Sequence, residues 1–154
     1  MARVLAWLSA RPVGGVLRYR AASYPQFRHG PLAETRTLRF LSALPANSNP
    51  RTKALAAQMR ADPALTAGGT QALVDAALKR LRTGGYEYTL EPGVYGEQTA
   101  DEFWFDRKAG FCEHIASSFV ILMRAANVPA RVVTGYQGGE RNPVDGYWTV
   151  RQSD

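Results

Sequence analysis

The chain has 154 residues, 45% of them hydrophobic and 21% charged, so it is long and apolar enough to form one domain with its own core. Its single cysteine excludes an internal disulfide and a metal site built from several cysteines. The sequence contains no apolar run long enough to span a bilayer.

The formal net charge of +6 raises the question of nucleic-acid binding. The arginines and lysines are spread along the chain, and the sequence has neither an RNP-like motif nor a zinc-finger spacing. We therefore expect no nucleic-acid partner. A modest positive surface also suits an acidic partner or an anionic membrane face.

The first half of the chain is expected to be a connector followed by helices. Residues 1–48 are interpreted as the connector, the tail of a preceding region, with one half-buried strand where apolar residues and arginines alternate over 16–24. Asn49 and Pro50 predict the start of a helix that runs to residue 61, because Asn is a common N-cap and Pro fits the first helical position. A second helix is expected over 70–82, followed by a short strand over 86–90.

The second half of the chain contains more recognisable signals of helices and strands. Thr99 and Glu102 have the spacing of a capping box, and a helix should then begin at Cys112 and end near Asn127. This helix is apolar on nearly every side beyond its first turn, which predicts burial on several sides. Two further strands are expected over 130–135 and 146–150, joined by a polar loop over 138–145.

These elements predict an α+β fold in which a buried helix, with a thiol at its N-terminus, packs on an antiparallel sheet. The position of Cys112 matters because the first N–H groups of a helix are unpaired and carry partial positive charge. That field favours the thiolate, which is the nucleophilic form, and Arg107 and Lys108 lie close enough in sequence to add to it. On spacing alone, however, a single cysteine is more often a small buried hydrophobic residue.

Three segments together resemble a known family. They are Gly110-Phe-Cys-Glu-His114, Leu122-Met-Arg-Ala-Ala126 and Val128-Pro-Ala-Arg-Val-Val-Thr-Gly-Tyr136. Their combination resembles the core of the transglutaminase-like superfamily, in particular its bacterial membrane-anchored members that carry a DUF3488 region. On this resemblance, residues 49–154 are the N-terminal portion of a transglutaminase-like domain.

The resemblance implies a papain-like arrangement of cysteine, histidine and aspartate. Cys112 would be the nucleophile that attacks an amide carbonyl and forms a thioester, and its backbone N–H would help bind the oxyanion. In the family the catalytic histidine follows a Ser-Asp pair, which here is Ser153-Asp154, the last two residues. We therefore expect the catalytic His and Asp beyond Asp154 and expect the chain to be inactive as it stands.

The two histidines of the chain are not expected to replace the missing base. His114 follows Cys112 by two positions on one helix, so the two side chains point about 200° apart. We interpret His114 as a structural or surface residue. His29 lies in a Pro- and Gly-rich stretch without a supporting motif, and we expect it to be solvated.

Three functional hypotheses remain. The favoured one is part of a cysteine acyltransferase or peptidase that acts on protein or peptide substrates, with no cofactor and no metal. The second is a non-catalytic transglutaminase-like module that binds peptide, and the third is a basic binder of nucleic acid or anionic surfaces. The resemblance implies an extracytoplasmic, periplasmic location in a membrane-anchored parent protein. The sequence does not indicate an oligomeric state.

Overall fold

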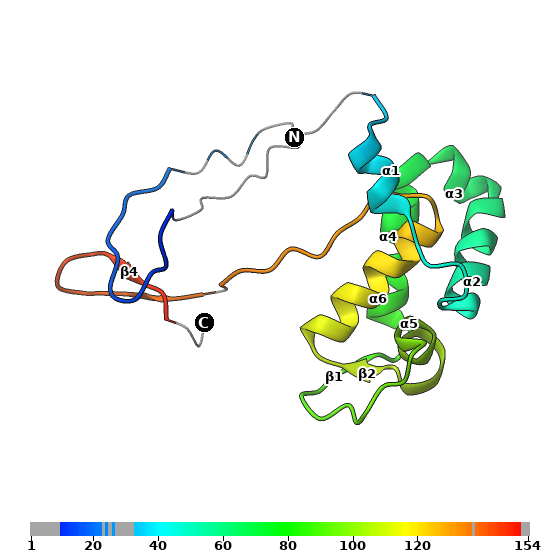
Figure 1. Cartoon of the computed structure of the whole chain (residues 1–154). Coiled ribbons are helices and arrows are strands. Elements are labelled where there is room, and N and C mark those ends of the chain that lie inside the picture. The colour runs from blue at the N-terminus through cyan, green and yellow to red at the C-terminus, as the bar shows by residue number, and fades with distance from the viewer. Residues whose placement is uncertain (1–9, 23, 25, 27–32, 137, 152–154) are drawn as a thin grey trace.

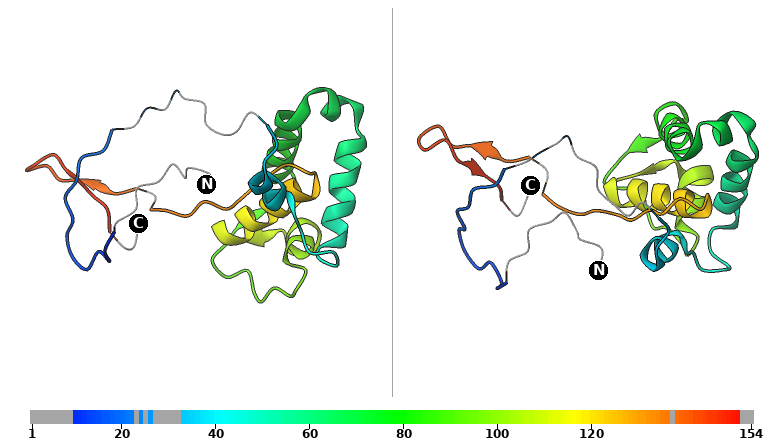
Figure 2. Two further views of the ribbon diagram at one scale, coloured as in Figure 1. Left: turned by 45° about the horizontal axis from the view of Figure 1, so that its top comes forward. Right: turned by 90° about the horizontal axis from the view of Figure 1, so that it is seen from above.

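The computed structural model describes residues 10–22, 24, 26, 33–136 and 138–151. Within these residues, a helical body is followed by an extended segment and a small hairpin (Figure 1). The hairpin lies apart from the helices, and residues 130–136 run between the two without forming a strand, as both views of Figure 2 show.

The body contains the helices α1 (Arg36–Ser42), α2 (Pro50–Ala61), α3 (Pro63–Ala67), α4 (Gly69–Thr83), α5 (Thr99–Asp101) and α6 (Cys112–Ala125), and the π-helix η1 (Glu102–Arg107). Its two short strands, β1 (Glu87–Tyr88) and β2 (Ala109–Gly110), pair in parallel. The hairpin pairs β3 (Glu140–Arg141) with β4 (Trp148–Thr149) in antiparallel register, Glu140 opposite Thr149.

The three main helices lie where the sequence predicts them. The expected helix starts at Pro50 and Cys112 are confirmed, and the helix predicted over 70–82 is α4, one residue longer at each end. Helical periodicity and terminal residues are local signals, so they survive in the folded chain.

The strand predictions are largely wrong. The described residues between 16 and 24 form no strand. Residues 130–135 also form no strand, although the Ala130 N–H donates to the Leu41 carbonyl of α1 (3.1 Å). The predicted strands over 86–90 and 146–150 are reduced to two residues each, and β3 falls in the segment expected to be loop. Alternation in a sequence becomes a strand only when another strand lies alongside to accept its hydrogen bonds.

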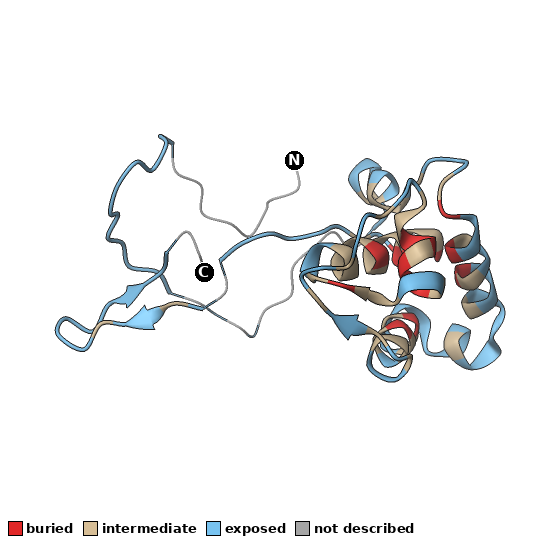
Figure 3. Cartoon of the chain, turned by 90° about the horizontal axis from the view of Figure 1, so that it is seen from below, coloured by how far each residue is buried: buried red, intermediate tan, exposed pale blue. Residues whose placement is uncertain are grey.

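The helix α6 packs differently from the prediction, although the α+β class is confirmed. Its neighbours are helices, chiefly α2 and α5, together with β2 at its start, whereas the antiparallel hairpin lies elsewhere. The buried residues gather inside the helical body, as the red segments of Figure 3 show. The sheet expected beneath α6 is therefore not among its neighbours in the described part of the chain.

The centre of the body is a cluster of aromatic rings. Phe103 and Trp104 are fully buried, and the Trp104 indole N–H donates a hydrogen bond to the Ser118 carbonyl of α6 (3.1 Å). Tyr86 stacks on Phe103 and donates its hydroxyl hydrogen to the Trp104 carbonyl (3.0 Å). The Trp104 indole N–H and the Tyr86 hydroxyl thus both have partners, as polar groups in a packed aromatic core require.

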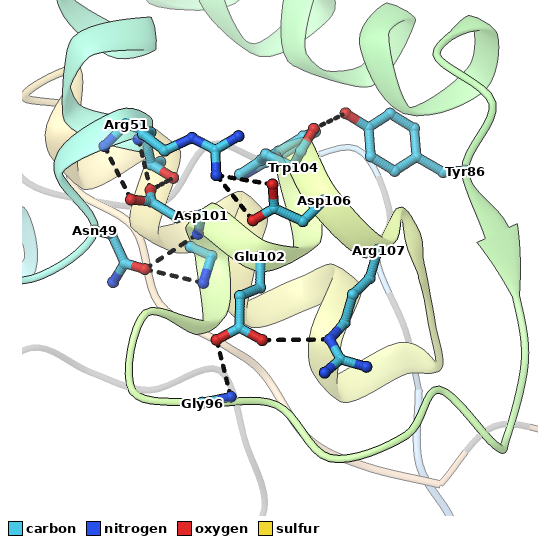
Figure 4. A network of polar contacts seen from close by, with 11 residues as sticks. Asn49, Arg51, Tyr86, Gly96, Asp101, Glu102, Trp104, Asp106 and Arg107 are labelled. Atoms are coloured by element: carbon cyan, nitrogen blue, oxygen red, sulfur yellow. Dashed lines mark hydrogen bonds and ion pairs between the residues drawn. The ribbon is translucent and has the colours of Figure 1, made fainter.

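Two helix starts cap each other through side chains that are distant in sequence (Figure 4). Asn49 Oδ1 accepts hydrogen bonds from the N–H groups of Ala100 and Asp101 (3.0 and 3.2 Å) at the start of α5. In return, the Asp101 carboxylate accepts from the N–H groups of Arg51 and Thr52 (2.9 and 2.7 Å) at the start of α2.

This exchange corrects two predictions about helix caps. Asn49 occupies the N-cap position of α2 but adopts a left-handed conformation (φ 47°), and its side chain caps α5 instead. The Thr99–Glu102 capping box does not form, because α5 receives no cap from its own N-cap residue and Glu102 Oε1 accepts from the Gly96 N–H (2.9 Å).

Candidate active site

Cys112 is the first residue of α6, and its side chain is exposed. Phe111, at the N-cap position, is extended and gives no side-chain hydrogen bond to the helix start. The first N–H groups of α6 are therefore not masked by a capping side chain, and their partial positive charge is available to a group at the helix end. The exposure also excludes the alternative that Cys112 is a small buried core residue.

A mainly apolar groove of about 530 Å³ opens beside Cys112. Its walls come from Leu78 and Leu81 of α4, Tyr88 of β1, the Ile115 and Phe119 side of α6, and residues 131–133. The expectation that α6 is buried on several sides is therefore only partly correct. Leu122 and Met123 are buried, but the side of α6 that carries Cys112 faces an open hollow.

A second hollow, of about 260 Å³, lies at the opposite end of α6. Arg60, Leu73 and residues 126–128 contribute to its wall. It contains no thiol, histidine or carboxylate and lies away from Cys112. Of these two hollows in the described part of the chain, only the groove has a thiol in its wall.

The turn before Cys112 is fixed by the parallel strand pair. The Glu87 N–H donates to the Lys108 carbonyl (2.8 Å), and the Thr89 N–H donates to the Gly110 carbonyl (3.0 Å). Gly110 also lies against the helix, because a Cβ at this position would come within 2.7 Å of the His114 Cβ. A glycine before the thiol is therefore required by close approach to α6.

His114 lies on a different side of α6 from the groove. Its ring packs against the rings of Tyr95 and Phe111, with centroid distances of 4.5 and 4.4 Å. Its Nδ1 is buried without a hydrogen-bond partner among the described residues. His114 does not contribute to the groove wall that holds Cys112, which agrees with the interpretation of His114 as structural. His29 lies outside the described residues.

The two cations before Cys112 do not act as the sequence suggested. The Arg107 guanidinium is bound to the Glu102 carboxylate (3.3 Å) and to the carbonyls of Pro92 and Val94. The Lys108 ammonium donates to the Gly84 carbonyl (3.1 Å) and lies over the Tyr86 ring. Both cations are bound to other groups of the body, so neither charge is directed at the thiol.

Two tyrosines near the thiol were not identified from the sequence. Tyr88 lines the groove together with Cys112, and Tyr95 donates its hydroxyl hydrogen to the Ala109 carbonyl (2.6 Å). Tyr88 lies in the strand predicted over 86–90. A prediction that this strand pairs with the turn before Cys112 would have placed Tyr88 near the thiol. Tyr95 lies in a loop with no periodic pattern, so the sequence offered no comparable signal for it.

Within the described residues, His, Cys, Asp and Glu do not gather in any group of three or more that could hold a metal ion. Among the helices of this part of the chain, none is long and apolar enough to cross a membrane.

Two solved structures share the fold. Both are crystal structures of the periplasmic domain of TgpA from Pseudomonas aeruginosa, and one of them is bound to ethylmercury. The first is 43% identical, with a TM-score of 0.71 over 80% of this chain and 41% of that chain. The second is 44% identical, with a TM-score of 0.69 over 77% of this chain and 41% of that chain.

Curated sequences give the same result. A protein-glutamine gamma-glutamyltransferase of Pseudomonas aeruginosa is 42% identical over 144 residues, which cover 94% of this chain and 21% of that protein. An uncharacterized protein of Bacillus subtilis, YebA, is 46% identical over 44 residues, or 29% of this chain and 6% of that protein. The chain thus spans about a fifth of the length of the first relative.

The model of the transglutaminase-like superfamily matches residues 53–154, about two thirds of the chain, and this segment contains α6, Cys112 and the groove. The helix with an exposed thiol at its start, the shared fold of the solved domains and this match lead to one conclusion: the chain belongs to the transglutaminase-like superfamily.

Proposed function

We propose that Cys112 is the nucleophile of a thiol-mediated acyl transfer on protein glutamine. The observation that carries the proposal is the placement of Cys112: an exposed thiol at the uncapped start of α6, opening onto an apolar groove. The name of the curated relative, a protein-glutamine gamma-glutamyltransferase, supports the substrate class. Hydrolysis of the same amide is the corresponding reaction when water accepts the acyl group.

The proposed reaction proceeds in two steps. The Cys112 thiolate attacks the carboxamide carbon of a glutamine side chain, the C–N bond breaks, and the nitrogen leaves as ammonia after it takes up a proton. The product is a thioester. An amine then attacks this thioester, forms a new amide and returns the thiol, whereas water would give a carboxylic acid instead.

The start of α6 supplies one element that this chemistry needs. The tetrahedral intermediate carries a negative oxygen, and the backbone N–H of Cys112 lies at the helix end, where no capping side chain competes for it. The groove beside the thiol would receive the apolar part of the substrate segment.

Among the residues that the structure describes, no histidine lines the groove beside Cys112. His114 packs against Tyr95 and Phe111, away from the groove, and we do not assign it as the base. We propose that a histidine and an orienting aspartate follow Asp154 in the parent protein, as the family resemblance implies. On this proposal the 154-residue chain does not turn over by itself.

We further propose that the domain works outside the cytoplasm, as part of a membrane-anchored protein. The similarity to the periplasmic domain of TgpA supports this location. The assignment of residues 1–48 to a preceding connector belongs to the same proposal. The helix α1 lies within that segment and packs against α6, so the C-terminal part of the connector would be packed on the helical body.

The direct test is glutamine-dependent incorporation of a primary amine by a form of the protein extended past Asp154. The extended protein should label a glutamine-containing peptide, and the Cys112→Ala variant should lose this activity. Cys112→Ser is the matched control, because it keeps the size of the side chain and replaces only the sulfur. Full activity in Cys112→Ala would contradict the proposal.

The groove also favours a second candidate function, a non-catalytic module that binds peptide. Its apolar walls would hold an extended segment whether or not a base is present. The same extended protein separates the two: peptide binding without amine incorporation, unchanged in Cys112→Ala, would favour the binding module.

A further inference from the structure

The loop formed by residues 92–96 is tied to both ends of η1, to Glu102 at its start and to Arg107 at its end (Figure 4). Arg107 donates from Nη1 to the Pro92 carbonyl (3.1 Å), from Nη2 to the Val94 carbonyl (2.6 Å) and from Nε to the Glu102 carboxylate (3.3 Å). The other Glu102 oxygen accepts from the Gly96 N–H (2.9 Å). The backbone of this loop is therefore held on both sides of Tyr95.

Tyr95 itself is half-buried and held in place by the same arginine. The Arg107 guanidinium lies over the Tyr95 ring, 4.9 Å from its centroid. Burial raises the pKa of Tyr95, partly offset by Arg107, while Glu102 raises it further. The hydroxyl thus stays protonated at neutral pH and remains a hydrogen-bond donor.

From this position Tyr95 contacts the chain on both sides of Cys112. Its hydroxyl donates to the carbonyl of Ala109, three residues before the thiol (2.6 Å). Its ring packs at 4.5 Å from the ring of His114, two residues after the thiol. Tyr95 is not among the residues that line the groove, so these contacts are its connection to the thiol.

The contact with Ala109 completes the support of the turn. On one side of the turn, the N–H groups of Glu87 and Thr89 donate hydrogen bonds to the carbonyls of Lys108 and Gly110. Successive carbonyls of an extended strand point to opposite sides, so the Ala109 carbonyl faces away from β1. The Tyr95 hydroxyl donates to the Ala109 carbonyl on that other side, so the turn before Cys112 is held between β1 and Tyr95.

We propose that Tyr95, held by Arg107 and Glu102, is a positioning residue for Cys112: it fixes the turn before α6 and the His114 side of its first helical turn, and so keeps the thiol at the free N–H groups. The inference rests on the proposed nucleophilic role of Cys112. Tyr95 acts through Ala109 and His114 and does not itself touch the reacting atoms.

The test measures the rate at which iodoacetamide alkylates Cys112 in the folded chain, divided by the rate in the same chain unfolded in urea. This ratio reports the folded environment of the thiol and does not depend on stability when the chain is fully folded. Tyr95→Phe keeps the ring against His114 and removes only the hydroxyl. We expect the ratio to fall roughly five-fold, the factor that corresponds to one hydrogen bond of ordinary net strength.

Tyr86→Phe is the matched control. Tyr86 also donates its hydroxyl hydrogen to a backbone carbonyl, that of Trp104 (3.0 Å), which lies outside the turn before Cys112. Tyr86→Phe removes this bond and keeps the ring beneath the Lys108 ammonium. It should lower the melting temperature and leave the alkylation ratio unchanged. Arg107→Gln should reduce the ratio as Tyr95→Phe does, and Arg107→Lys, which keeps a cation beside the ring, should recover part of it.

The outcomes separate this inference from the proposed function. If Cys112 of the parent chain reacts no faster than the unfolded thiol, the nucleophilic role fails. If the parent thiol is fast and Tyr95→Phe leaves the ratio unchanged or raises it, the positioning role fails. The proposal also fails if Tyr86→Phe lowers the ratio as much as Tyr95→Phe, since the effect would then follow stability alone.

Discussion

The helical body (residues 33–129) and the arm, made of the segment 130–136 and the hairpin within 138–151, differ in how far their apolar residues are buried. In the body, Trp104 is fully buried and its indole N–H has a partner. In the arm, Trp148 is 67% exposed, and Val133 and Tyr136 are 78% and 62% exposed. Each region carries one tryptophan, so the residue type alone does not decide whether the ring is buried. The difference shows that apolar content becomes structure only where a complementary surface is present.

The candidate site lies at the boundary between the packed body and its open surface. Cys112 lies at the edge of the well-packed body, where α6 leaves its neighbours and faces the groove. The buried side of α6 holds the helix in the body, while its other side lines the groove. A thiol that must be both positioned and accessible fits this boundary better than either the core or the arm.

The test with the largest expected effect replaces one tryptophan in the body and one in the arm. Trp104→Ala should destabilise the chain by about 3–5 kcal/mol, because it removes a fully buried ring and leaves a cavity. Trp148→Ala should change the free energy of unfolding by no more than about 0.5 kcal/mol. Urea unfolding of both variants measures the difference, and equal losses would show that the arm is packed as tightly as the body.

The next test concerns the exchanged caps. Asp101→Ala should cost about 3 kcal/mol, since it leaves the buried N–H group of Thr52 and the start of α2 without an acceptor. Asp145→Ala in the arm removes an ion pair with Arg18 that is largely exposed, and it should cost less than about 1 kcal/mol. The caps would not be a main support of the body if the two losses were similar.

A third test uses two glycines. Gly110→Ala places a Cβ against the His114 Cβ and should destabilise the body by about 1–3 kcal/mol. Gly135→Ala, in the extended segment, meets no atom within 4 Å and should be close to neutral. Thermal unfolding of the pair compares them directly. A neutral Gly110→Ala would mean that α6 does not lie as close to the turn as described.

The smallest expected effect is a pH dependence. Burial raises the pKa of Tyr95 above its ordinary value of 10.0, with Arg107 opposing and Glu102 adding to the shift. The folded state then holds its proton longer than the unfolded state, so the stability contributed by Tyr95 is present below pH 10 and is lost as the pH rises through the folded pKa. Tyr95→Phe should therefore lose less stability between pH 9.5 and 11 than the parent chain, a range set by the tyrosine pKa. Identical pH curves for the two chains would contradict the shift.

The sequence predicts the helices of this protein well and its long-range contacts poorly. The helices α2 and α6 begin at Pro50 and Cys112, as predicted from the residue types and apolar spacing next to each start. Asn49 and Asp101 are about fifty residues apart and cap each other's helices, a contact that no local pattern encodes. The local capping box at Thr99 was outcompeted by this distant pair.

The candidate site shows the same division. Cys112 was identified from its local position at a helix start, and its exposure agrees with that prediction. The groove wall from α4 and the contact between Tyr95 and Ala109 arise from tertiary packing. Arg107 shows how proximity in sequence misleads, because its charge is bound to the loop at residues 92–96 and not directed at the thiol.

The central claim is that the start of α6 activates the Cys112 thiol, and its reactivity in the folded chain tests this most directly. Mass spectrometry can follow alkylation by iodoacetamide at neutral pH in the folded chain and in the same chain unfolded in urea, where the thiol is the only one present. We predict that the folded thiol reacts about ten-fold faster, as expected for a thiol at a helix N-terminus. An equal or slower rate in the folded chain would contradict the account.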